Sequence, residues 1–283
     1  MSVAAPSRGQ RLRIVGSEAV KLPAFVRRDF LQAWSYRMAF VSDAAGLAFQ
    51  AFLFFYIGQM VNPDVLPTYG AGNVSYLEFV AVGIAISMLI GLGVFRAAYA
   101  FRREQLMGTL EALLMTPTAP STIQFGSVVY DLVYMPVRTG VFFAAIALTN
   151  EVSFNASGIL PATATLLIFI PFVWGLGIMY SAATLTFKVG GGGFAISLLA
   201  ITSGAYFPLT LFPDWLAALA EFNPMAIAID TMRECLLGDA GWSAVASGLY
   251  VLAPASLITL TLGIVSFRLA LRRERRRGSV GLY

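Results

Sequence analysis

Residues 102–120 read RREQLMGTLEALLMTPTAP and separate two long apolar segments of the chain. Leucines recur here at helical spacing and give one side of a helix an apolar surface (Leu106, Leu110, Leu113 and Leu114). Glu104 and Glu111 are two helical turns apart and can flank a similar face, while Pro117 and Pro120 end the helix. The stretch predicts a short amphipathic helix between two membrane spans. It fits a docking surface for a soluble partner, or a linker helix lying on lipid headgroups.

The composition is that of a polytopic membrane protein. The 283 residues are 58% hydrophobic and 12% charged, with a mean hydropathy of +0.76; soluble domains are about 25% charged. At about 20 residues per crossing, the chain holds six spans with short loops. The absence of histidine excludes His-based acid–base and metal sites, and the single Cys235 excludes an intrachain disulfide.

The expected architecture is an all-α membrane protein with six transmembrane helices in a single domain, 1–283. An N-terminal tail and interface helix occupy 1–37, with Phe25, Phe30 and Trp34 on one face of 23–37. The spans fall within 38–269, at residues 38–61, 77–101, 122–149, 159–186, 195–211 and 244–269. Residues 212–242 are too broken by prolines and acids to cross, so they fold back, and 270–283 form a basic tail.

The distribution of basic residues predicts the orientation. Of the 19 Lys and Arg residues, seven precede or begin the first span and six close the chain. Three more lie at or near the 102–120 side (Arg96, Arg102 and Arg103). Both termini and the 102–120 helix are therefore expected on the cytosolic side, which requires an even number of spans.

Charges inside spans are costly and need a partner or a function. Asp131 and Arg138 are seven residues apart on the third expected span and share a face. They fit mutual or interhelical pairing, or a role in a transport pathway. Asp43 lies near the start of its span, where capping or snorkelling suffices. Arg233, on the outer side, is expected to pair with a carboxylate.

The chain has no G-x-x-x-x-G-K-[ST] sequence and thus no P-loop for nucleotide. Two other runs are informative: 104–117, EQLMGTLEALLMTP, and 203–238, SGAYFPLTLFPDWLAALAEFNPMAIAIDTMRECLLG. Together they resemble the coupling helix and the fifth span with its re-entrant segment in type-2 ATP-binding-cassette (ABC) exporter permeases. The resemblance implies that 102–117 couples to a separate ATPase, through Glu104, Gly108, Thr109, Leu110, Glu111, Leu113, Leu114, Thr116 and Pro117.

The resemblance also implies an outer cap and a translocation path. Two re-entrant helices would form the cap, with Pro213, Trp215, Asn223, Pro224, Asp230, Arg233 and Gly238 as landmarks. The path would run at a dimer seam, lined or gated by Met88, Gly91, Phe95, Ser203, Tyr206, Phe207 and Pro208. On the residues alone, packing, lipid contact or an aromatic belt explains the same positions equally well.

The predicted function is a non-catalytic permease subunit of an ABC exporter in the bacterial inner membrane. It would form a homodimer or a heterodimer with a similar permease, and bind two ATPase subunits and membrane lipids but no nucleic acid. ATP and Mg would be bound by the partner, and this chain would hold no cofactor or metal. The cargo would be a hydrophobic or amphipathic small molecule, a lipid or a lipid-linked glycan. An ion-coupled secondary carrier using Asp131 and a membrane-embedded transferase using the outer acids are the alternatives.

Overall fold

The computed structural model describes residues 20–62, 66–69, 74–118, 120–149, 152–187 and 193–277, which form helices and no β-strand. The α-helices are α2 (Leu22–Ser35), α3 (Arg37–Gly58), α4 (Tyr76–Leu106), α5 (Leu110–Met115), α6 (Pro120–Ala147), α7 (Ile159–Phe187), α8 (Gly193–Ile201), α9 (Asp214–Glu221), α10 (Pro224–Leu236) and α11 (Gly241–Arg277). Two 3-10 turns lie at Ala156–Gly158 and Leu209–Leu211.

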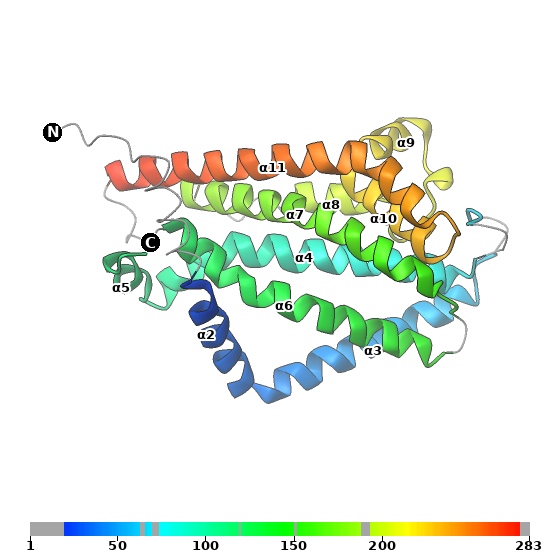
Figure 1. The fold of residues 1–283 in the computed structure, drawn as a ribbon, viewed down its shortest axis with the longest axis horizontal. Helices are drawn as coiled ribbons and strands as arrows, with labels where there is room; N and C mark the ends of the chain where they lie inside the picture. Colours follow the sequence, from blue (N-terminus) through cyan, green and yellow to red (C-terminus); the bar gives the residue numbers. More distant parts are fainter. Residues whose placement is uncertain are drawn as a thin grey trace.

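The long helices run lengthwise beside one another, as Figure 1 shows. Helix α4 is central and packs against α6, α7 and α10, while α11 packs along α7. Helix α5 lies at one end of the bundle, and α9 lies at the other (Figure 1). Helix α2 meets α3 at a bend and slants away from it beside α6.

Among the described residues, four helical segments are long and apolar enough to cross a membrane: Arg37–Gly58, Tyr76–Arg96, Ala156–Phe187 and Gly241–Glu274. They correspond to the first, second, fourth and sixth expected spans. The third expected span corresponds to α6, which has 28 residues. Among the residues described there, the apolar part is the shorter segment Val137–Ala147.

The fifth expected span, 195–211, is α-helical only up to Ile201, so the prediction of its length is wrong. Helix α8 has 9 residues and ends at Ile201. Its last carbonyls are taken by side chains: Thr202 Oγ1 donates to Leu198, and Asn223 Nδ2 donates to Leu199. Gly204 then adopts a φ of 66°, a left-handed conformation that no helix continues. Side-chain capping and this glycine therefore end the helix where hydropathy alone would extend it.

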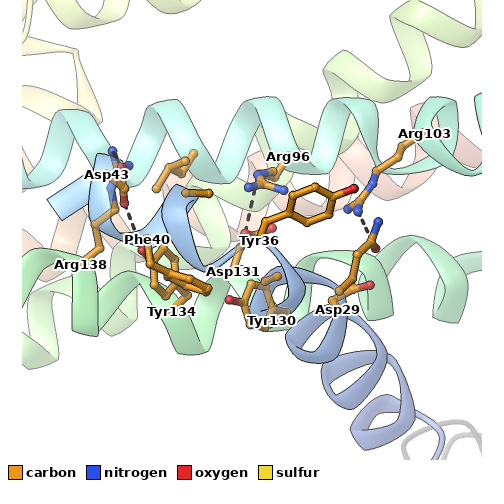
Figure 2. A pocket seen from close by; sticks show the side chains of 14 residues that line it. Asp29, Tyr36, Phe40, Asp43, Arg96, Arg103, Tyr130, Asp131, Tyr134 and Arg138 are labelled. Atoms are coloured by element: carbon orange, nitrogen blue, oxygen red, sulfur yellow. Dashed lines mark hydrogen bonds and ion pairs between the residues drawn. The ribbon is translucent and has the colours of Figure 1, made fainter. Parts of the chain in front are cut away.

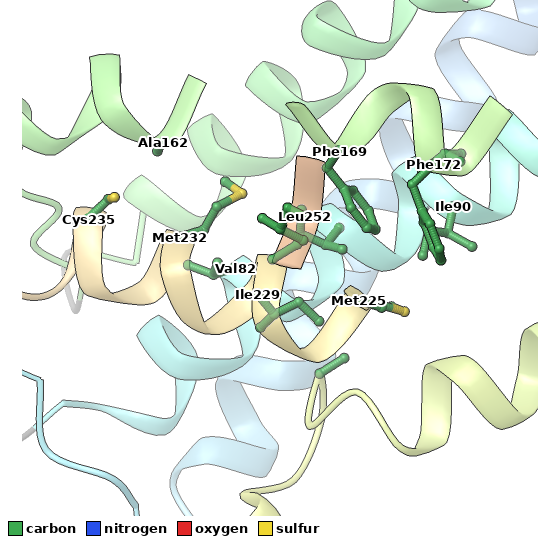
Figure 3. Close-up of a cluster of buried hydrophobic side chains, with 14 of the residues drawn as sticks. Val82, Ile90, Ala162, Phe169, Phe172, Met225, Ile229, Met232, Cys235 and Leu252 are labelled. Atoms are coloured by element: carbon green, nitrogen blue, oxygen red, sulfur yellow. The ribbon is translucent and has the colours of Figure 1, made fainter. Parts of the chain in front are cut away.

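The main core lies where α4, α7, α10 and α11 meet (Figure 3). Fully buried side chains fill it, among them Phe169, Ile229 and Leu252. Cys235 is a free, buried cysteine in this cluster and packs there as a small apolar residue.

Helices α7 and α11 approach closely because glycines face the contact. A Cβ at Gly175 would lie 2.4 Å from the carbonyl carbon of Thr259, and one at Gly263 would lie 2.6 Å from Gly175 O. Ser256 Oγ also donates to Ile168 O at 2.7 Å. Small residues and an interhelical hydrogen bond are typical of helix pairs packed within a membrane.

Helix α3 is the least covered of the four segments. Of its apolar window 11% is buried, against 67% for α4. The exposed face is rich in large apolar side chains, including Phe49, Phe52 and Tyr56. Such a face suits lipid or another protein surface rather than water.

Candidate functional site

The predicted docking segment 102–117 is two helices and not one. Helix α4 continues to Leu106, and α5 begins at Leu110 and ends at Met115. Gly108 lies between them with a φ of +68°, and Thr109 N donates to Glu104 O at 3.0 Å. A Cβ at Gly108 would meet nothing within 4 Å, so within the described residues it is the left-handed turn, and no packing contact, that requires this glycine.

Glu104 anchors this turn to α2. Its carboxylate, 5% exposed, lies 2.9 Å from Arg28 Nη2 and also accepts a hydrogen bond from the Thr109 hydroxyl. Arg28 Nε in turn lies 2.8 Å from Asp29 Oδ1. Desolvation lowers the pKa of Arg28, but Asp29 and Glu104 outweigh it and the pKa is raised overall. Glu104 therefore has a structural role, as the ion-pair partner of Arg28 on α2.

Helix α5 itself is short and partly uncovered. Leu113 is half-buried against a cluster containing Phe25 and Ile123. Met115 is 90% exposed, and Leu106 and Met107 at the turn are 66% and 52% exposed. The side chains of Leu110, Glu111 and Leu114 lie outside the described residues.

The end of α5 is fixed by local hydrogen bonds. Thr116 is extended, with a ψ of 156°, and its hydroxyl donates to Leu113 O at 2.6 Å. The extended conformation is the one favoured before proline, here Pro117. Lys21 Nζ donates to Pro117 O, so the chain after α5 is also joined to the segment before α2.

The expectation for the aromatic residues of α2 is partly wrong. Phe30 and Trp34 stack at 5.8 Å on the exposed side, but Phe25 is buried against Gly126 of α6. A step of five residues turns a helix by about 140°, so Phe25 cannot share their face.

Asp131 and Arg138 have interhelical partners and do not pair with each other. Arg96 Nε of α4 lies 3.6 Å from Asp131 Oδ1, and Arg138 Nη2 lies 2.8 Å from Asp43 Oδ1 of α3 (Figure 2). Tyr134 Oη also donates to Asp43 Oδ2 at 3.1 Å. Asp43 therefore serves neither as a cap nor as a snorkelling residue, because it joins α3 to α6 within the bundle.

The predicted cap residues lie around α9 and α10. Pro213 precedes α9, and Trp215 is 67% exposed. The Asn223 side chain accepts from Met225 N at 2.9 Å, which caps α10 ahead of Pro224. Gly238 lies just beyond α10, and its N–H donates to Arg233 O at 3.3 Å.

Arg233 is the buried anchor of this end, with 3% exposure. It donates to the carbonyls of Phe79, Gly204 and Ala205 at 2.9–3.2 Å, and its guanidinium carbon lies 3.5 Å from the centre of the Phe79 ring. Burial lowers the pKa of Arg233 to about 10.

The expected carboxylate partner of Arg233 is replaced by main-chain oxygens. Asp230 Oδ1 instead accepts from Tyr69 Oη at 2.9 Å. Burial raises the pKa of Tyr69, so this hydroxyl keeps the proton that it donates.

The predicted path residues lie in different environments within this chain. Met88 and Tyr206 pack at the edge of a cluster between α3, α4 and α6, where Tyr206 stacks on Phe54 at 5.9 Å. Phe95 is 41% exposed and contacts Tyr180 of α7. Gly91 faces open space, Phe207 is 58% exposed, and Ser203 and Pro208 are buried.

Sequence reasoning missed the partners Arg28, Arg96 and Tyr69. The pairing of Arg96 was predictable in part, because Arg96 is a charged residue within the expected span 77–101 and Asp131 is an acid within the next expected span. Tyr69 carried none, because a tyrosine in a loop has many ordinary explanations.

Comparison with known proteins identifies the family. Residues 21–237 match the family model described as ABC-2 type transporter. The chain belongs to the ABC-2 type transporter family. It is thus an integral membrane protein of ABC transporter permease type, as the resemblance implied.

Two curated relatives illustrate the similarity within this family. The chain is 26% identical over 204 residues to the "Probable multidrug ABC transporter permease YbhR" of Escherichia coli K12, covering 71% of this chain and 54% of the relative. It is 28% identical over 216 residues to "Nodulation protein J" of Rhizobium leguminosarum bv. viciae, covering 75% of this chain and 81% of that protein. The chain thus spans about half the length of the E. coli permease.

Proposed function

We propose that this chain is the transmembrane subunit of an ATP-driven exporter, and that the turn at Gly108 and α5 bind a separate ATPase. The chain would work as a dimer and form the translocation path. ATP hydrolysis would take place on the partner and be transmitted by rigid-body motion of packed helices. Family membership supports the permease role, and the multidrug name of the E. coli relative favours a hydrophobic or amphipathic cargo.

The observation that carries the proposal is the exposed apolar surface around the turn. Leu106, Met107 and Met115 project large side chains at one end of the bundle, where α5 lies. Apolar side chains gathered at such an end suit burial in a partner's groove. Glu104 joins the same turn to α2 through its ion pair with Arg28. A displacement of α5 would therefore move α2 and α4 together.

The test is co-purification of the full chain with the ATPase encoded beside it, followed by measurement of ATP hydrolysis. Met115→Glu places a charge in the exposed apolar surface, and Glu111→Arg reverses a charge in α5. Each is expected to weaken the complex at least tenfold. The control is Asp214→Arg, an exposed charge reversal in α9 at the opposite end of the bundle.

The outcomes separate the proposal from the carrier alternative. If the control binds the ATPase and both α5 variants do not, the docking assignment stands. If no ATPase binds and transport persists without ATP, the assignment fails. In that case Asp131→Asn should abolish transport, since an ion-coupled carrier needs an intramembrane acid.

A further inference from the structure

A polar cavity of about 450 Å³ lies among α2, α3, α4 and α6. Its lining combines three arginines, three aspartates and several aromatic rings, as Figure 2 shows for the labelled side chains. Arg103 belongs to the lining, which places the cavity toward the end of α4 that leads to α5. The cavity is separate from the exposed apolar surface proposed to bind the ATPase.

Two of the three acids of the cavity, Asp43 and Asp29, are already engaged. Both carboxylate oxygens of Asp43 have partners, since Oδ1 lies 2.8 Å from Arg138 Nη2 and Oδ2 accepts from Tyr134 at 3.1 Å. Asp29 lies 2.8 Å from Arg28, a residue outside the lining. A cation entering the cavity would have to displace these bonds.

Two of the three arginines, Arg138 and Arg96, have a donor without a hydrogen bond, whereas Arg103 donates to Gln32 Oε1 at 2.7 Å. Arg138 Nε is buried and makes no hydrogen bond within the described part of the chain. The Arg96 Nε to Asp131 Oδ1 separation of 3.6 Å is beyond hydrogen-bond length. A buried, unsatisfied charged donor is unfavourable, so the site favours a ligand that supplies acceptor oxygens.

A phosphate group matches these donors, because guanidinium groups bind its oxygens through charge-assisted hydrogen bonds. The surroundings favour a lipid as its source. Tyr36 lines the cavity and is 69% exposed, and it leads onto the apolar surface of α3 at Met38 and Val41, which are 73% and 59% exposed. Acyl chains could lie along this surface while the headgroup enters the cavity.

We propose that this cavity binds the phosphate headgroup of a membrane phospholipid between Arg96 and Arg138. The ligand would join α4 and α6 through donors of Arg96 and Arg138 that make no hydrogen bond within the described residues. The site uses no residue of the proposed ATPase contact, so binding is measurable on the permease chain alone.

The test is native mass spectrometry of the purified full chain with added phosphatidylglycerol. We expect one retained lipid per chain, and at least tenfold weaker binding for the double variant Arg96→Gln/Arg138→Gln. Because that variant removes the ion pairs of Asp43 and Asp131, Ala39→Trp provides a second test. Ala39 lines the cavity, and the indole would occupy it while every ion pair remains.

The matched control is Arg268→Gln/Arg272→Gln, which removes two exposed arginines from α11 and should leave binding unchanged. A diacylglycerol with the same acyl chains, which lacks phosphate, should bind at least tenfold more weakly. The proposal is overturned if Ala39→Trp retains the lipid, or if diacylglycerol binds equally well. Displacement of the lipid by millimolar inorganic phosphate would likewise overturn the lipid assignment.

Discussion

The two ends of the helix bundle are held by different kinds of contact. At the α10 end, Arg233 is 3% exposed and donates to main-chain carbonyls of α4 and of the segment after α8. At the α5 end, Glu104 is held by Arg28, whose side chain is 38% exposed. One anchor is a buried guanidinium directed at backbone, and the other is a side-chain pair in which Arg28 is partly exposed and Glu104 is buried.

This difference indicates which end can rearrange. A buried guanidinium that leaves its carbonyls loses its hydrogen bonds with no water to replace them. A partly exposed ion pair exchanges its partner for water at little cost. The α10 end is therefore expected to keep one arrangement, and the α5 end to rearrange more easily.

The largest effect is expected from Arg233→Met. The substitution removes the hydrogen bonds that the buried Arg233 side chain donates to three main-chain carbonyls. The free energy of unfolding should fall by about 3–5 kcal/mol, because several hydrogen bonds of a buried charged group are lost. Denaturant unfolding in detergent measures it, with the exposed Arg268→Met as control. Equal stability of the two variants would show that the α10 end is not anchored through this side chain.

A glycine pair on α4 sharpens the same contrast. A Cβ at Gly83 would lie 2.0 Å from Ala205 O, whereas Gly91 on the same helix has nothing within 4 Å. Gly83→Ala should lower stability by about 1–3 kcal/mol through overpacking. Gly91→Ala should raise it by about 0.5–1 kcal/mol through helix propensity. Similar free energies of unfolding for the two variants would mean that the segment after α8 does not pack against α4 at Gly83.

At the α5 end, Gly108→Ala tests the turn. The alanine has space but must adopt a φ of +68°, which costs about 1–2 kcal/mol. Gly108→Asn should cost less, because asparagine tolerates the left-handed region better. Thermal unfolding compares the two variants with Gly140→Ala, an alanine added at an open position of α6. If both Gly108 variants match wild type, the turn is not left-handed.

The smallest effect is expected for the Arg28–Glu104 pair. In a double-mutant cycle with Arg28→Gln and Glu104→Gln, the coupling energy should be about 0.5–1 kcal/mol and decrease with salt. A coupling energy above about 3 kcal/mol, insensitive to salt, would contradict an adjustable α5 end. The coupling energy and its dependence on salt are measured from the unfolding of the four proteins at two salt concentrations.

Apolar length predicted the long helices well. The first and second expected spans began within one residue of α3 and α4, because a run of apolar residues fixes what can lie in a bilayer. The same property failed at 195–211, since hydropathy carries no information on backbone conformation. Gly204 and the side chains of Thr202 and Asn223 decide that helix end.

The site was predictable in its location but not in its contacts. The 102–117 pattern located the turn and α5, and Gly108, which it included, forms the left-handed turn. The partners of Glu104, Asp43 and Asp131 come from other helices. Such pairings depend on how helices are rotated against one another, which spacing along a single helix does not determine.

The close contact between α7 and α11 also bears on how the chain is made. Ser256 and Ile168, joined across this contact, are 88 residues apart in sequence. A ribosome therefore completes α7 well before α11 exists, since chains emerge at about 5–20 residues per second. Until then the glycine face of α7 around Gly175 must rest against lipid or a temporary partner. Truncation within α11 would leave that face permanently unpaired.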